Sequence, residues 1–307
     1  MEESPLTFSD FEFPKTKVDV GEIKKFASEN QFMFLAVELL KEVARITAIL
    51  ACSYRGQDDK PRKWNRNEAI LGGLMVRISK LQLALLDQTI QKRLEIAFII
   101  FRCLAESLIN LDYLLKRDSD DVFDEYIEYS LREEKRLLIR IKNNVAKRGY
   151  ELPIEKGMIS SIEQSFETSS FVPEQVDETN WTPWGEKIYK RAETVGLEDA
   201  YFALFSLPSH SVHGNWQDLI AYHLKHENGE FSPNTQWGYP RPQFLFTIAL
   251  FSADTNKLYL DKILQDCQDK DQINKLLDDI ILRVRVADEL HEQFLNQTPD
   301  QTSHAQT

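Results

Sequence analysis

Apolar residues recur at every third or fourth position along most of the chain, a period that predicts α-helices. The expected helices cover residues 21–53, 68–89, 92–116, a stretch from the capping run 118–121 to about 148, 154–166, 185–195 and 198–213, with a closing pair at 243–266 and 269–296. Strand-like alternation is scarce, so the sequence predicts an all-α fold, a multi-helix bundle.

The helix expected at 92–116 should lie at the centre of this bundle. Its segment 96–115, IAFIIFRCLAESLINLDYLL, is apolar nearly all round. A helix without a polar face belongs in a core. With the helices before and after it, connected by short links, it predicts an antiparallel set. Gly72 and Gly73 in the preceding helix are small enough to allow another helix to approach closely.

Three stretches fall outside the helical pattern. Residues 1–20 carry Pro5 and Pro14 and predict an extended lead-in, and residues 297–307 predict a disordered tail. The segment 226–243, rich in Gly, Pro and Asn, predicts an exposed loop. Residues 21–296 are therefore expected to form a single helical domain.

Composition favours a folded protein that does not bind nucleic acid through charge alone. Of the 307 residues, 42% are hydrophobic and 28% charged, which suits a packed core. The 49 acidic against 37 basic residues give a net charge of −12, which repels phosphate backbones. The basic run at 132–148 is the best local candidate for a phosphate-facing surface, although such a run is usually a solvated helix face.

The sequence indicates a cytoplasmic protein without a disulfide, metal or membrane anchor. Cys52, Cys103 and Cys267 are far apart, which predicts buried free thiols in a reducing compartment. The N-terminus lacks the apolar core of a secretory signal, and the longest apolar run, Ile96–Phe101, is too short to span a membrane. No Gly-rich phosphate loop, HExxH or GxSxG motif occurs, so no cofactor is predicted.

A polar stripe crosses the apolar central helix. Arg102, Glu106 and Asn110 are four residues apart in turn, and Tyr113 falls on the same face. Burying a charged pair is costly unless other polar groups satisfy it, so this stripe should face such groups. Two interpretations stay open: an internal ion pair that fixes the helix register, or the floor of a polar pocket.

A second polar group lies in SLPSHSVHGNW, residues 206–216. Ser209 and His213 are four residues apart and would share one helix face, with His210 offset by about 60°. Gly214 suits the end of that helix, where a protonated His213 would be stabilised by the helix dipole. The alternatives are a histidine that caps the helix or a member of a functional site.

Pro208 within this segment and a second histidine pair after it bear on its backbone and on a possible metal site. Pro208 has no N–H and should disrupt the helix around Leu204, which would leave polar side chains beside an irregular backbone. His223 and His226 form a further pair that suggests a metal site. Zinc needs a third and a fourth ligand at fixed geometry, and the two pairs would point apart on one helix. No metal site is therefore predicted.

The segments IFRCLAESLINLDYLLK and WGEKIYKRAETVGLEDAYFALFSLPSHSVHGNW resemble a bacterial family known as domain of unknown function family 5677, over about residues 65–225. That family carries Arg-x-x-x-Glu in an apolar helix and, later, a Tyr followed by Ser-x-x-Val-His-Gly. The matching positions are Arg102, Glu106, Tyr201, Ser209, Val212, His213 and Gly214. The resemblance implies an all-helical fold and no established activity.

The same family is loosely similar to the HEPN helical proteins, many of which are metal-independent ribonucleases in toxin and phage-defence systems. In those proteins an Arg-x(4–6)-His motif, usually paired across a dimer, carries out the chemistry. Its histidine moves a proton, and its arginine stabilises the developing negative charge of a phosphorane. The resemblance thus implies a HEPN-like core, a homodimer and RNA as alternatives. In this chain the nearest arginine before His210 is Arg191, so such a pair could form only between helices, from Arg102 and His213.

We therefore expect a binding or regulatory protein in a stress or defence setting, with Arg102, Glu106, Ser209 and His213 at its centre. The expected binding side chains around this centre are Asn110, Tyr113, Tyr201, His210, Asn215 and Trp216. Its expected partners are a small-molecule or RNA ligand, a second copy of the chain and a protein encoded nearby. A HEPN-like ribonuclease using Arg102 and His213 is the main alternative, and another hydrolase or lyase using the same residues is the third.

Overall fold

The structure is a computed structural model that describes residues 13–53, 63–265, 267 and 269–297. The predicted all-α class is confirmed. The helices are α1 (Val20–Ile23), α2 (Glu29–Cys52), α3 (Arg66–Ile90), α4 (Leu94–Arg117), α5 (Asp120–Arg148), α6 (Pro153–Ser169), α7 (Ile188–Thr194), α8 (Glu198–Tyr201), α9 (Leu207–His213), α10 (Trp216–Asp218), α11 (Pro242–Ile263) and α12 (Lys270–Gln297). Shorter elements are the 3₁₀ turn η2 (Pro173–Gln175), the π-helices η3 (Phe202–Ser206) and η4 (Leu219–His223), and the strands β1 (Leu224–Glu227) and β2 (Glu230–Pro233).

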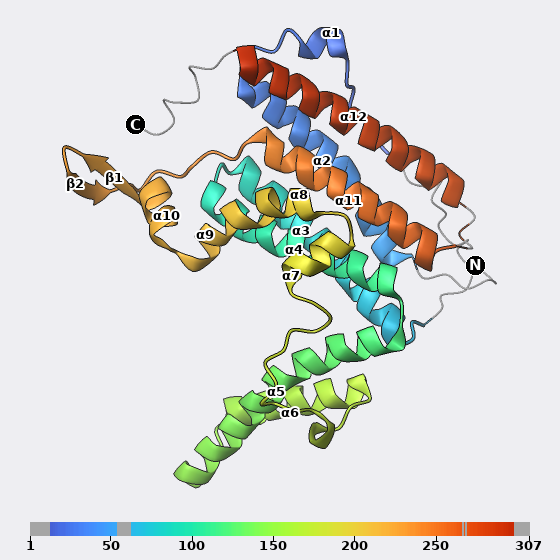
Figure 1. Ribbon diagram of the computed structural model, residues 1–307, viewed down its shortest axis with the longest axis vertical. Helices are drawn as coiled ribbons and strands as arrows, with labels where there is room; N and C mark the ends of the chain where they lie inside the picture. The colour runs from blue at the N-terminus through green and yellow to red at the C-terminus, as the bar shows by residue number, and fades with distance from the viewer. Residues whose placement is uncertain (1–12, 54–62, 266, 268, 298–307) are drawn as a thin grey trace, which may run out of the picture.

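The body of the molecule is a bundle of α2, α3, α4, α11 and α12 (Figure 1). Helix α4 touches α3 and α11 and also receives α7, η3 and α9 on its remaining side. Leu104, Leu108 and Leu111 of α4 are fully buried, which confirms the central helix that its apolar sequence predicts. The short segments α7 to α9 thus lie against the helix that carries the polar stripe.

Helix ends follow the capping residues in the sequence. The Asn65 side chain accepts a hydrogen bond from the Glu68 backbone N–H, and Glu68 accepts one from the Asn65 backbone N–H, both at 2.9 Å. This reciprocal capping box starts α3 at Arg66, two residues before the expected start of the helix. Gly149 ends α5 with a φ of +84°, as its position after basic residues predicts. The predicted lead-in is described only from residue 13, and the tail after residue 297 lies outside the described residues.

The expected antiparallel set of three helices holds for α3 and α4 but not for α5. Helix α5 leaves the body and runs beside α6 (Figure 1). The two helices share a separate apolar cluster, which includes Leu131, Leu138, Ile141, Ile162 and Phe166. Most faces of α5 are polar, so beyond its first turns only a narrow apolar stripe needs cover, and α6 together with Phe171 and Val176 supplies it.

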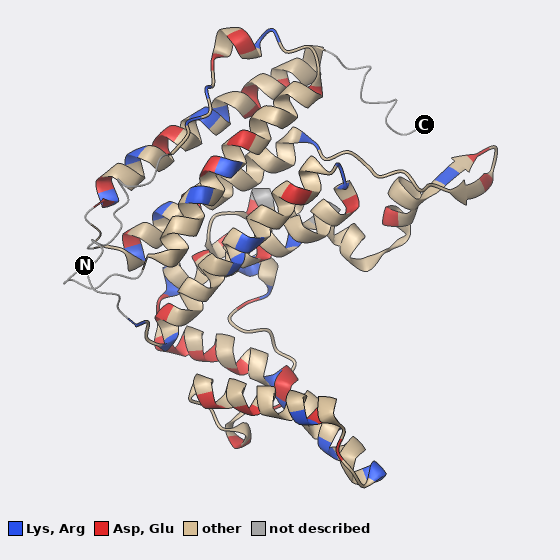
Figure 2. Ribbon diagram, turned by 180° about the vertical axis from the view of Figure 1, so that it is seen from behind, with Lys and Arg blue, Asp and Glu red and all other residues tan. Residues whose placement is uncertain are grey.

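The basic run at 132–148 begins with cations that hold a loop rather than face a phosphate. Arg132 donates to the Thr182 carbonyl at 2.8 Å and Lys135 to the Val176 carbonyl at 2.7 Å. Arg136 donates to two further carbonyls of the loop between η2 and α7. Basic and acidic residues are interspersed along the helices of the body and of the α5–α6 projection (Figure 2). This part of the run is therefore structural.

The segment expected to be an exposed loop contains an exposed β-hairpin. Strands β1 and β2 pair antiparallel around Asn228 and Gly229, whose φ values of +52° and +85° suit a two-residue hairpin turn. Each strand has only four residues, too few for alternation to be visible. The prediction of a loop is therefore wrong for residues 226–233. The Asn-Gly pair was the sequence signal that indicated a hairpin turn.

The three cysteines differ in their exposure to solvent. Cys52 is exposed while Cys103 and Cys267 are half-buried, so the expectation of buried thiols is wrong for Cys52, the last residue of α2.

Helix α3 is long and apolar enough to cross a membrane by length and composition alone. It packs between α2 and α4, however, and a core helix passes the same test.

The two glycines of α3 differ in the space beside them, so alanine at each position should change stability in opposite directions. A methyl group on Gly72 would meet the Trp64 ring at 2.5 Å, whereas one on Gly73 would meet nothing within 4 Å. Gly72 thus makes room for an indole, not for the neighbouring helix expected from the sequence. We expect Gly72→Ala to lower the free energy of unfolding by about 1–2 kcal/mol through overpacking. Gly73→Ala should raise it by about 0.5–1 kcal/mol through helix propensity.

Denaturant unfolding of the two variants beside the wild type measures both signs. Equal effects of the two substitutions would show that the Trp64 contact does not constrain α3.

Candidate functional site

Arg102 joins two segments that are 107 residues apart in the chain. Its Nη1 donates to Glu106 Oε2 at 2.6 Å, and its Nε donates to Ser209 Oγ at 3.3 Å. The guanidinium also lies over the Phe205 ring, 3.0 Å from its centroid, in a cation–π contact. Ser209 in turn donates to the Phe205 carbonyl one helical turn earlier. The predicted meeting of the stripe on α4 with the Ser-His segment is therefore present for Arg102, Glu106 and Ser209, which we call the arginine centre.

The arginine centre reaches the surface at its carboxylate. The Arg102 side chain is 19% exposed, while that of Glu106 is 42% exposed. Exposure weakens an ion pair because water screens it and competes for its hydrogen bonds. Glu106 therefore contributes modestly to stability while remaining accessible from solvent.

A second arginine is bonded to the polar stripe of α4, and the charge of Glu106 acts on it. Arg191 of α7 is buried, donates from Nη1 to Asn110 Oδ1 at 2.7 Å and stacks on Trp184 at 4.1 Å. Burial lowers the pKa of Arg191, and the negative charge of Glu106 opposes that shift. Among the described residues, Arg191 Nε has no hydrogen-bond partner. The negative charge of Glu106 thus acts on two guanidinium groups, one of which is incompletely hydrogen-bonded.

Sequence reasoning missed Arg191 as part of the site. The available signal was its place on the apolar face of a short helix, where Ile188, Ala192 and Val195 recur at helical spacing. An arginine on such a face is expected to find polar partners inside the fold. The polar stripe of α4, already identified, was the natural candidate for those partners.

The two tyrosines predicted for the site lie in different surroundings. Tyr201 stacks on Phe205 with ring centroids 4.7 Å apart. Burial raises the pKa of its hydroxyl, while the charges of Arg102 and Glu106 act on it in opposite directions. Tyr201 thus borders the arginine centre. Tyr113 instead packs edge-on against Trp184 at 5.7 Å and is buried, so it stabilises the contact between α4 and the loop that precedes α7.

An irregular helix brings Phe205 and Ser209 onto α4. The path from α8 to α9 passes through the π-helix η3, which ends two residues before Pro208. Because proline has no N–H, it cannot bond the Leu204 carbonyl as a regular helix would require. The predicted disruption around Leu204 is confirmed. Wider π turns of this kind occur frequently at functional sites.

His213 is not part of the arginine centre in this structure. It is exposed at the end of α9, and no hydrogen bond or ion pair between described residues joins it to Arg102, Glu106 or Ser209. Ser209 is one turn earlier, and the helix stops at Gly214, whose φ is +55°. The imidazole therefore faces solvent one turn beyond the centre.

The remaining predicted binding residues shape the turn after α9. The Asn215 side-chain nitrogen lies 2.6 Å from His210 Nδ1, within hydrogen-bond distance. Asn215 also caps α10 by accepting a bond from the Asp218 backbone N–H at 3.2 Å. Trp216 lies edge-on to the Phe231 ring of β2 at 5.7 Å. None of these contacts involves the arginine centre.

The second histidine pair is divided between two roles. His223 Nε2 lies 3.2 Å from Asp218 Oδ2, and Asp218 Oδ1 accepts a bond from Ser211 at 2.7 Å. His226 stacks on Phe231 at 4.6 Å. Within the described ranges, no three His, Cys, Asp or Glu side chains are placed to hold a metal ion.

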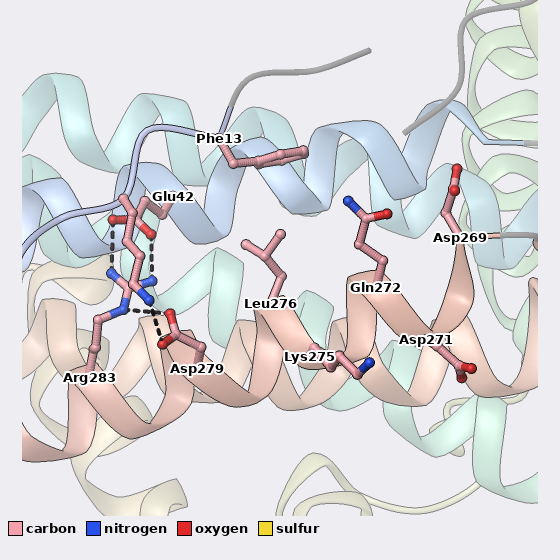
Figure 3. A pocket seen from close by; sticks show the side chains of 10 residues that line it. Phe13, Glu42, Asp269, Asp271, Gln272, Lys275, Leu276, Asp279 and Arg283 are labelled. Atoms are coloured by element: carbon pink, nitrogen blue, oxygen red, sulfur yellow. Dashed lines mark hydrogen bonds and ion pairs between the residues drawn. The ribbon is translucent and has the colours of Figure 1, made fainter. Parts of the chain in front are cut away.

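A hollow of about 700 Å³ lies elsewhere, between the lead-in, α2 and α12 (Figure 3). On its wall, Arg283 donates to both Glu42 oxygens at 3.0 and 2.7 Å, to the Thr16 carbonyl at 3.0 Å and to Asp279 at 2.8 Å. Each nitrogen of this guanidinium is thereby bonded within the fold. These contacts attach the lead-in to the bundle, which is a structural role.

The fold and the arginine centre together define an all-helical protein with a half-exposed arginine–carboxylate site on its central helix. A family model described as "Family of unknown function (DUF5677)" matches residues 68–231, just over half of the chain. The chain belongs to this family. The matched range contains the arginine centre and Arg191 but neither Glu42 nor Arg283. Comparisons with curated proteins and with solved structures found no match.

Proposed function

We propose that this protein binds a small anionic ligand, through a phosphate or carboxylate group, at the arginine centre. Binding there would serve a regulatory role in a bacterial stress or defence setting. A cytoplasmic location and a partner protein encoded nearby belong to the same proposal.

One observation carries it: Arg102 is fixed by Glu106, Ser209 and Phe205 while the Glu106 carboxylate stays 42% exposed. A solvent-exposed ion pair stabilises a fold only modestly because water screens it, so stability alone gives little reason for this arrangement. Here the guanidinium is held in one orientation by groups from two segments, and the site remains accessible. Such preorganisation lowers the entropy that a ligand must lose on binding.

The charge balance favours an anion. Glu106 pairs with Arg102 and its charge also acts on Arg191, whose Nε has no hydrogen-bond partner among the described residues. Guanidinium groups bind phosphate and carboxylate through paired hydrogen bonds. A small ligand fits better than a polynucleotide because the chain carries a net charge of −12.

Inorganic phosphate is the simplest probe of this site. At constant ionic strength, phosphate should raise the melting temperature of the wild type saturably, because a ligand that binds only the folded state stabilises it. Arg102→Gln should abolish this rise. Arg45→Gln, which alters an exposed arginine of α2, should keep it.

Thermal unfolding with phosphate or chloride at matched ionic strength makes the measurement, with circular dichroism to verify that each variant is folded. An equal rise with chloride, or a full response from Arg102→Gln, would reject the proposed anion site.

The second candidate is a metal-independent ribonuclease that uses Arg102 and His213. The contact between Arg102 and Ser209 favours it, because His213 follows Ser209 by one turn of α9 and is exposed. In this case single-stranded RNA or tRNA should be cleaved in the presence of a chelator, and His213→Ala should abolish cleavage without unfolding the protein. Intact RNA after incubation with the wild type would exclude it.

A further inference from the structure

The β-hairpin projects from the body beyond α10 (Figure 1). Its described sheet contains only β1 and β2, so both outer edges are free of a third strand. Apart from the half-buried Leu224, every residue of the two strands is exposed. An isolated two-stranded hairpin is only marginally stable in water, and a free strand edge readily pairs with another chain. These features call for a partner that covers the hairpin.

The pairing register shows which groups face outward. The Asn234 N–H donates to the His223 carbonyl at 2.9 Å, so these residues form a hydrogen-bonded pair. Such pairs alternate with non-bonded pairs along an antiparallel ladder. Leu224 and His226 therefore direct their N–H and C=O groups away from β2. On the outer edge of β2, Pro233 offers no N–H, which makes β1 the better edge for a new strand.

We propose that β1 pairs antiparallel with β1 of a second copy of this chain, about a two-fold axis at His226. Each His226 would exchange both backbone hydrogen bonds with its counterpart. Lys225 would then lie directly opposite Glu227 of the second copy, and the symmetry would produce this ion pair twice. Residues of a non-bonded antiparallel pair bring their side chains closest, which suits oppositely charged groups.

Charge complementarity selects both the partner and the register. Two other registers also pair the outward-facing groups of Leu224 and His226. The one centred on Leu224 places Lys225 opposite His223, which has no negative charge, and the one centred on Lys225 places Lys225 opposite its own counterpart, a like-charge pair. Only the axis at His226 matches opposite charges from two identical strands. A second copy is thus the partner whose sequence complements this edge.

The opposite face of the hairpin supports the same arrangement. His226 stacks on Phe231 at 4.6 Å, Trp216 lies edge-on to Phe231 at 5.7 Å, and all three rings are exposed. Pairing of two β1 strands would form a four-stranded sheet in which the ring clusters of both copies continue one another. A sheet of this size with an apolar face is more stable than the isolated hairpin.

Charge reversal tests the pairing in the full-length protein. Sedimentation equilibrium of the wild type should show a monomer–dimer equilibrium. Lys225→Glu and Glu227→Lys should each raise its dissociation constant about tenfold, because both symmetric ion pairs become like-charge pairs. The double variant Lys225→Glu/Glu227→Lys restores opposite charges and should return to the wild-type value. A monomeric wild type, or a dimer indifferent to the single reversals, would overturn the proposal.

Cysteine crosslinking tests the register independently. In a Cys52→Ser background, a mixture of Lys225→Cys and Glu227→Cys chains should form an intermolecular disulfide on mild oxidation. Leu219→Cys, on the exposed π-helix η4, mixed with Glu227→Cys provides the matched control and should not crosslink. Equal crosslinking in both mixtures, or none in the first, would contradict a β1–β1 pair centred on His226.

Discussion

Glu42→Ala should lower the free energy of unfolding by about 3–5 kcal/mol, the largest loss expected from any single substitution considered for this chain. The Glu42 and Arg283 side chains are only 6% and 9% exposed. Removing the carboxylate leaves a buried guanidinium that has lost two of its hydrogen bonds. The Thr16 N–H, which donates to the same carboxylate, also loses its acceptor.

Urea unfolding at neutral pH measures this loss, and two further variants serve as comparisons. The double variant Glu42→Leu/Arg283→Met should recover most of the stability, since replacing both partners leaves no orphaned charge. Asp279→Asn, which weakens only the more exposed contacts of this carboxylate with Arg283 and Lys15, should cost less than about 1 kcal/mol. A loss from Glu42→Ala no larger than that of Asp279→Asn would show that the pair does not anchor the lead-in.

Asp112→Asn should stabilise the protein at alkaline pH. Asp112 faces α11 from the buried side of α4, and burial raises its pKa to about 7, while Thr255 and Lys116 oppose this shift. Its Oδ1 has no hydrogen-bond partner among the described residues. The folded protein must therefore hold either a proton or an unfavourable buried charge at this position.

Proton linkage gives the sign of the pH dependence of stability that Asp112 causes. The pKa of Asp112 is about 7 in the folded state against an ordinary value of 3.8, so between these values the folded state binds more protons than the unfolded state. Stability due to this group is therefore full at low pH, falls as the pH rises from about 4 to about 7, and then levels off. Over that range the wild type should lose up to about 4 kcal/mol relative to Asp112→Asn.

Denaturant unfolding of both proteins across this pH range supplies the difference curve. Asp271→Asn, on the exposed surface of α12, should follow the wild type throughout. A difference between wild type and Asp112→Asn that does not change with pH would mean that Asp112 is ionised in the folded protein at every pH tested.

The helices and the meeting of Arg102 with Ser209 could be predicted because each depends on local rules. Helical periodicity locates the buried central helix, and the four-residue spacing of Arg102 and Glu106 sets their ion pair. Burial of charge then requires a polar partner from elsewhere, and the Ser-His segment was the richest source. Ser209 supplies that partner at 3.3 Å.

The features that could not be predicted depend on where helices point after they end. Periodicity along α5 says that one stripe needs cover but not that α6, rather than the bundle, supplies it. The exposure of His213 follows from the stop of α9 at Gly214, one turn past the contact with α4. For Arg191, by contrast, the apolar spacing of α7 was a signal that it needs internal polar partners, although no periodic pattern fixes the course of the loop that brings α7 to Asn110.

The central claim is that Arg102 belongs to a binding site, whereas Arg283 is an internal tie. Side-chain ¹⁵N NMR of the arginine Nε–H groups tests this directly, with the resonances assigned through Arg102→Lys and Arg283→Lys. On titration with phosphate at constant ionic strength, we expect the Arg102 resonance to shift saturably and that of Arg283 to stay in place. An Arg102 resonance that does not move, or one that moves only together with Arg283, would contradict the proposed anion site.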